Sequence, residues 1–164
     1  MSEQAGGQFA LYSLDRQQGR AIWFLGTLTF VKATTDQTRG AFGLIEQLLP
    51  AGRGSPYHVH HKEDEAFYIL EGQCTFISGD RSFQARAGSY VFLPRDIPHG
   101  FRADTLSRVL VLATPGGFEQ FVVEAGEPAT RLELPPPQEP DVAKLVSVAA
   151  KYGIEILGPL PEIE

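Results

Sequence analysis

Three of the four histidines in this 164-residue chain lie in one short segment, PYHVHHKEDEAFYILEG, at residues 56–72. If residues 57–61 are extended, His58 and His60 project to the same face of a strand and their imidazoles converge. Glu65 follows where apolar side chains alternate along the chain, so its carboxylate is expected to enter an apolar interior, where an unpaired charge is costly. A divalent cation bound by these groups removes that cost. Residue types and spacing therefore predict a metal site.

His99 supplies a third imidazole from PRDIPHGF at residues 94–101, where Pro94 and Pro98 stiffen the chain. The predicted ligands are three imidazoles and one carboxylate, those of His58, His60, Glu65 and His99. Such ligands serve iron, manganese, nickel, cobalt and zinc alike, so we expect one divalent transition metal per chain, of unknown identity. Four protein ligands leave a five- or six-coordinate ion with open positions, as in catalytic or ligand-binding sites.

The neighbours of the predicted ligands have other expected roles. His61 falls on the opposite face of the extended segment and is expected in solvent. Glu63 and Asp64 belong to the acidic run KEDE and are also expected in solvent. Glu46 has apolar neighbours and either supports a ligand imidazole from behind or is exposed.

Composition and charge exclude several classes of protein. The net charge of -6 repels a phosphate backbone, so nucleic acid is not an expected partner. Cys74 is the single cysteine, which excludes an internal disulfide and a multi-cysteine zinc site; we expect it in the core. The N-terminus has no signal-peptide pattern, and apolar runs fall far short of the roughly 20 residues of a membrane helix. We therefore expect a cytoplasmic protein without a membrane partner.

Glycines and prolines divide the middle of the chain into short apolar segments, which is typical of many strands. Gly79 and Asp80 lie between two such segments and predict a hairpin turn. The number of strands suits a barrel or a double-sheet jelly roll. The expected strands are residues 21–32, 40–49, 65–71, 73–77, 82–86, 89–93, 99–103 and 107–113.

Apolar residues recur at helical spacing at 118–125, and again after Asp141, an expected N-cap. Phe118 and Phe121 on the first helix either cover the mouth of the barrel or simply pack on it. A proline-rich connector precedes the second helix, which Gly153 is expected to end. We expect two regions: a barrel with N-terminal strands at 1–130, and a connector with a helix packed on the barrel at 131–164.

These residues resemble the two motifs of the cupin superfamily. The first, G-x5-H-x-H-x4-E-x6-G, is matched in full by Gly52, His58, His60, Glu65 and Gly72. The second, G-x5-P-x-G-x2-H-x3-N, is matched by Gly88, Pro94 and His99. Asp96 replaces its glycine, which is expected to preserve a left-handed turn, and Ala103 replaces its asparagine, which removes a polar group.

The resemblance implies an all-β fold, the double-stranded β-helix or jelly-roll barrel, with a short C-terminal helical appendage and with the metal inside, held by the four matching residues. Residues 23–52, 116–129 and 151–159 are similar to small single-domain cupins grouped with quercetin 2,3-dioxygenases. This similarity implies a metal-dependent dioxygenase that uses dioxygen on a metal-chelating aromatic, flavonol-like or enediol-like small molecule. It also implies that Glu65 is the catalytic base.

Two other functions remain open. One is a module that binds a small molecule at the metal without turnover. The other is a non-oxidative isomerase or decarboxylase, which would be expected to place several Lys or Arg side chains inside the barrel. Aromatic side chains at strand spacing are candidates for the substrate pocket, although such residues more often belong to a core. These candidates are Tyr57, Phe67, Phe76, Phe92, Phe101 and Phe118.

Single-domain cupins commonly pair through strand edges, and the resemblance therefore implies a homodimer. The apolar tract at 21–31 is the candidate for that exchange.

Overall fold

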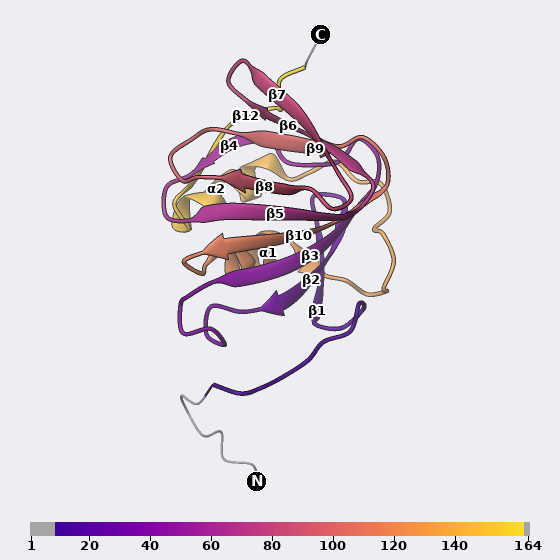
Figure 1. Cartoon of the computed structure of the whole chain (residues 1–164), viewed down its shortest axis with the longest axis vertical. Helices are drawn as coiled ribbons and strands as arrows, with labels where there is room; N and C mark the ends of the chain where they lie inside the picture. The colour runs from indigo at the N-terminus through magenta and orange to yellow at the C-terminus, as the bar shows by residue number, and fades with distance from the viewer. Residues whose placement is uncertain (1–8, 163–164) are drawn as a thin grey trace.

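Short strands joined by tight turns build most of this computed structural model, which describes residues 9–162 (Figure 1). Two short helices follow the main run of strands. The strands are β1 (Arg20–Phe24), β2 (Thr27–Ala33), β3 (Gly43–Leu49), β4 (Tyr57–His60), β5 (Asp64–Glu71), β6 (Gln73–Ser78), β7 (Arg81–Arg86), β8 (Tyr90–Leu93), β9 (Gly100–Ala103), β10 (Ser107–Thr114), β11 (Glu127–Pro128) and β12 (Ile154–Gly158). The helices are α1 (Phe118–Ala125) and α2 (Val142–Lys151).

The strands form a jelly roll whose sheets enclose the core. A seven-stranded sheet has the order β11-β1-β2-β3-β10-β5-β8, and it faces a three-stranded sheet, β7-β6-β9, and the pair β12-β4. The pairing is antiparallel throughout. Side chains therefore alternate between the core and the outer face along each strand.

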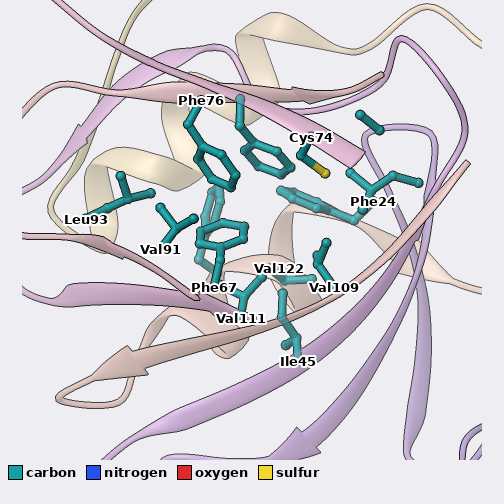
Figure 2. Packing of buried hydrophobic residues seen from close by; sticks show 14 of the residues in the cluster. Phe24, Ile45, Phe67, Cys74, Phe76, Val91, Leu93, Val109, Val111 and Val122 are labelled. Carbon is teal, nitrogen blue, oxygen red and sulfur yellow. The ribbon is translucent and has the colours of Figure 1, made fainter. Parts of the chain in front are cut away.

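Aromatic rings fill the centre of the core (Figure 2). Phe67 from the large sheet packs edge-on against Phe76 and Phe101 from the small sheet, with ring centroids 5.2 and 5.0 Å apart. Cys74 is fully buried beside them, as predicted. These contacts fix the spacing between the two sheets and support the inner end of the site described below.

The single strand predicted over 21–32 is wrong, because the chain turns back at Leu25 and Gly26 to form the hairpin of β1 and β2. Both turn residues have positive φ, 48° and 76°, and the apolar leucine conceals the turn in the sequence. β2 is paired on one side with β1 and on the other with β3, so the tract proposed for exchange is already paired within the chain. The homodimer stays a prediction.

Three predicted local features are confirmed. Gly79 and Asp80 join β6 to β7, with Ser78 opposite Arg81. Asp96, which replaces the motif glycine, has φ 65°, the left-handed conformation expected of that position. The carboxylate of Asp141 accepts a hydrogen bond from the Lys144 backbone and caps α2.

The C-terminal part adds a strand that the sequence did not predict. After Gly153, β12 pairs with β4, so that Ile154 lies opposite His60 and Ile156 opposite His58. α2 packs against α1 and β12. The division of the chain at residue 130 stays a prediction, but the tail supplies one wall of the barrel. In the described residues, neither helix is long and apolar enough to cross a membrane.

Candidate metal centre

The four predicted ligands meet inside the barrel. His58 and His60 lie on β4, Glu65 lies on β5, and His99 directly precedes β9. Each is at least nine-tenths buried. The backbone of His58 is paired with that of His99: each amide donates to the other's carbonyl, at 2.9 and 2.8 Å. Strand pairing therefore sets the position of two imidazoles before any metal binds.

The ligand atoms lie close enough to share one ion. The Nε2 atoms of His58 and His60 are 3.1 Å apart. Glu65 Oε2 lies 3.2 Å from His60 Nε2 and 2.9 Å from His99 Nε2. Atoms that each sit about 2.1 Å from a common ion are about 3 Å from their neighbours. The spacing of the four groups, all within 4.8 Å of one another, therefore suits a single transition metal.

The other nitrogen of each ring is held by an acceptor outside the cluster. Nδ1 of His58 donates to the Pro56 carbonyl at 2.8 Å, and Nδ1 of His99 donates to the Ile97 carbonyl at 3.1 Å. Nδ1 of His60 donates to a carboxylate oxygen of Glu63 at 2.7 Å. With protons on Nδ1, the Nε2 lone pairs face inward, as metal binding requires.

Two inward lone pairs at 3.1 Å repel each other unless a positive charge lies between them. In the metal-free protein a proton on His60 supplies that charge. Burial opposes this protonation, but the charge of Glu65 and the hydrogen bonds to Glu63 and Glu65 outweigh it and raise the pKa of His60 to about 10. Burial and the nearby His60 lower the pKa of His58 to about 4. The residues therefore fit a divalent cation in place of that proton.

Glu65 remains ionised in this cluster. Burial by itself would raise its pKa, but the charge of His60 and the hydrogen bond from His60 hold the pKa well below its usual range. The carboxylate is therefore negatively charged and available to a metal ion.

The prediction that Glu63 is solvated is wrong, because this residue is 2% exposed and contacts His60. A signal for it existed: Glu63 lies two residues before Glu65 and so shares its face of the extended chain. Asp64 between them turns outward to Arg95. His61 is exposed, as expected, and its ring contacts carboxylates on both sides.

A mostly apolar cavity opens onto the cluster. Its volume is about 50 Å³, and all the empty space around it, open solvent included, is about 600 Å³. Phe118 on α1 lies at its edge, with its ring 5.4 Å from that of His60. Ile154 and Ile156 of β12 form another wall. Sequence reasoning missed this wall because it assigned the tail only to a helix packed outside.

Of the six pocket candidates, the structure places three on the cavity: Phe67, Phe101 and Phe118. Phe76 is buried behind them in the core. Tyr57 and Phe92 do not line this cavity, so the structure gives their predicted role in the substrate pocket no support. The Tyr57 hydroxyl accepts a hydrogen bond from Gly79. Phe92 takes the outward position on β8 and is 53% exposed.

Glu46 neither supports an imidazole nor is exposed. It lies on β3 and its carboxylate contacts Arg108 at 2.8 Å. It is buried, and it lines a hollow away from the metal cluster.

Comparison with known proteins agrees with this architecture. Residues 45–115, which carry the whole cluster, match the cupin domain family. The chain is 28% identical over 118 residues to quercetin 2,3-dioxygenase of Bacillus subtilis (strain 168), which covers 71% of this chain and 35% of that protein. The chain thus spans about a third of that relative's length.

Two solved structures share the fold at lower identity. An RmlC-like cupin from Shewanella frigidimarina NCIMB 400 aligns with a TM-score of 0.58 at 17% identity, over 69% of this chain and 97% of that one. A polyketide cyclase from Streptomyces resistomycificus aligns with a TM-score of 0.55 at 23% identity, over 77% of this chain and 83% of that one. Residues 45–115 thus match a cupin domain, and the whole chain resembles the cupin superfamily in its jelly-roll fold and its cluster of three histidines and one glutamate.

Proposed function

We propose that this protein is a metal-dependent dioxygenase that acts on a metal-chelating aromatic or enediol-like small molecule. One observation carries the proposal: three imidazole nitrogens and one carboxylate oxygen converge at a cavity whose other walls are largely apolar. Such a site can bind a ligand's chelating oxygens at the ion and its apolar body against the walls. The similarity to the Bacillus subtilis quercetin 2,3-dioxygenase supports the same chemistry.

The charge of the cavity argues against strongly anionic substrates. Among the described residues that line it, none is Lys or Arg. A sugar acid or keto acid would bring carboxylates that find no cationic side chain there, beyond the ion itself. This favours the oxygenase over the isomerase or decarboxylase alternative.

The ion would be held by His58, His60, Glu65 and His99, and when bound it would favour the ionised form of a substrate hydroxyl and supply the redox capacity for reaction with dioxygen. Among the described residues, the contacts of Glu65 run through Oε2. Its Oε1 is therefore the oxygen that takes the hydroxyl proton as the substrate binds. The walls at Phe67 and Phe101 exclude water from the bound molecule.

Oxygen consumption tests this proposal. Protein loaded with iron, manganese, cobalt or nickel is mixed with flavonols, and oxygen uptake and products are followed. We expect uptake with at least one metal, and its loss in Glu65→Gln but not in Glu139→Gln, an exposed carboxylate on the connector. Metal content is measured for each variant. An absence of uptake with all four metals contradicts the proposal, and recovery of the bound flavonol unchanged favours the binding module.

A further inference from the structure

Gln47 is a polar side chain inside the cavity, at a distance from the metal cluster. It lies on β3, is 5% exposed, and lines the same cavity as His60 and Glu65. Strand register gives its place: Glu65 lies opposite Ala113, which lies opposite Gly43. Gln47 is four residues farther along β3, which is about 13 Å in the strand direction. The cavity therefore has polar groups toward both ends.

Hydrogen bonds fix the orientation of the Gln47 amide. Thr27 Oγ1 donates to the Phe24 carbonyl at 2.6 Å, and it lies 2.9 Å from Thr29 Oγ1. Because the Thr27 proton is already used, Thr29 must donate to Thr27. Thr29 Oγ1 can then only accept from Gln47, whose Nε2 lies 3.2 Å away. A reversed amide would leave the two threonine oxygens facing each other without a proton between them.

The fixed amide keeps unused hydrogen-bonding capacity. Among the described residues, the side chain of Gln47 makes this single hydrogen bond. Its Oε1 and its second N–H therefore have no protein partner, in a cavity walled by side chains such as Leu49 and Val111. Among the described residues, only Arg108 Nε is both fully buried and unpaired, so Gln47 Oε1 is open to the cavity and can be reached by a ligand. A hydroxyl group supplies both complements, since it can donate to Oε1 and accept from the N–H.

We propose that Gln47 forms a second polar subsite of the cavity, which binds a hydroxyl group at the end of the ligand remote from the metal. The inference rests on the proposed function for the metal-bound end and narrows its substrate class. The substrate is an elongated aromatic molecule with a chelating group at one end, a hydroxyl group at the other, and an apolar body between them. Phe67, two residues after Glu65 on the same face of β5, contacts that body.

A pair of redox-inert probes tests the subsite separately from oxygenase activity. Protein loaded with Zn²⁺ is titrated calorimetrically with biphenyl-4-carbohydroxamic acid and with its 4'-hydroxy derivative, which chelate identically and differ only at the remote end. We expect the wild type to bind the hydroxylated probe about five- to tenfold more tightly, the value of one hydrogen bond. Gln47→Met, which keeps the side-chain length and removes the amide, is expected to abolish the preference.

Matched variants complete the test. Gln84→Leu removes an exposed amide from β7 and should keep the preference. Thr29→Val keeps Gln47 but removes the hydrogen bond that orients its amide, and should reduce the preference for the hydroxylated probe. If Gln47→Met does not fold, Thr29→Val takes its place in the test. Equal binding of the two probes by the wild type, failure of both to bind, or a preference that survives in Gln47→Met and Thr29→Val overturns the subsite. A preference without oxygen uptake on flavonols overturns the proposed function alone.

Discussion

Glu63 shows how one side chain can govern the metal site without touching the ion. Its carboxylate accepts the Nδ1 proton of His60 at 2.7 Å in a buried position. That contact fixes the ring orientation and makes Nε2 a stronger ligand. The other two imidazoles rely on backbone carbonyls for the same purpose, so His60 is the ring whose support a substitution can remove.

We therefore expect Glu63→Gln to weaken metal binding about 10- to 100-fold, because a neutral amide supports the imidazole less well than a carboxylate. Competition titration with a chromophoric zinc chelator measures the change. Asp64→Asn is the matched control, since the neighbouring carboxylate faces Arg95, and it should leave metal affinity unchanged. Equal affinities for Glu63→Gln and the wild type would show that Glu63 does not support the site.

A second prediction at the residue scale is that His60 releases a proton when the metal binds. At pH 7 the pKa of about 10 keeps His60 protonated. The pKa of His58, about 4, leaves its ring neutral, and the lowered pKa of Glu65 leaves its carboxylate ionised. Binding therefore displaces one proton from His60, and affinity should rise about tenfold per pH unit from pH 7 toward pH 10. Calorimetry in buffers of different ionisation enthalpy measures the released proton.

The same shift has a consequence for the metal-free protein. Because the pKa of His60 in the folded protein lies above its ordinary value of 6.5, the protonated ring stabilises the fold below pH 6.5, and this contribution is lost as the pH rises through about 10. Denaturant unfolding of metal-free protein across that range should show the decline. A pH-independent metal affinity would contradict the assignment of the proton to His60.

At the scale of secondary-structure elements, the sequence predicts what periodicity and spacing control. The motif strands, both helices and the Asp141 cap follow from alternation, helical spacing and a capping residue. The hairpin at Leu25 was missed because an apolar residue occupies its turn. β12 was missed because its partner, β4, lies almost a hundred residues upstream. The alternation of residues within a short segment does not show which distant strand that segment pairs with.

β12 offers a test of how the tail supports the site. Ile154 is 4% exposed and lies on the cavity opposite His60, whereas Glu155 points outward from the same strand. Ile154→Ala should lower the free energy of unfolding by about 2–4 kcal/mol through lost burial and the cavity it leaves. Glu155→Ala should cost less than about 1 kcal/mol. Urea unfolding of the two variants measures the difference, and similar losses would mean that β12 is not a wall of the core.

At the scale of the whole molecule, the cluster joins β4, β5 and the loop before β9, which are separate in the sequence. An ion bound by these groups is bound only by the folded chain, so it must stabilise the fold. At a free concentration 100 times its dissociation constant, the gain is about 2.7 kcal/mol. For a chain of this size, that gain corresponds to a rise in Tm of about 5–10 °C.

Thermal unfolding with added Zn²⁺, and again after chelation, therefore reports whether the four groups act as one site. His58→Ala should remove the rise in Tm, because it deletes one imidazole from the cluster. His61→Ala should keep the rise, because that ring lies at the surface between Asp96 and Glu155. If both variants kept the rise, the ion would be bound elsewhere. If both lost it, the surface histidine would also contribute to the site, contrary to its position between two surface carboxylates.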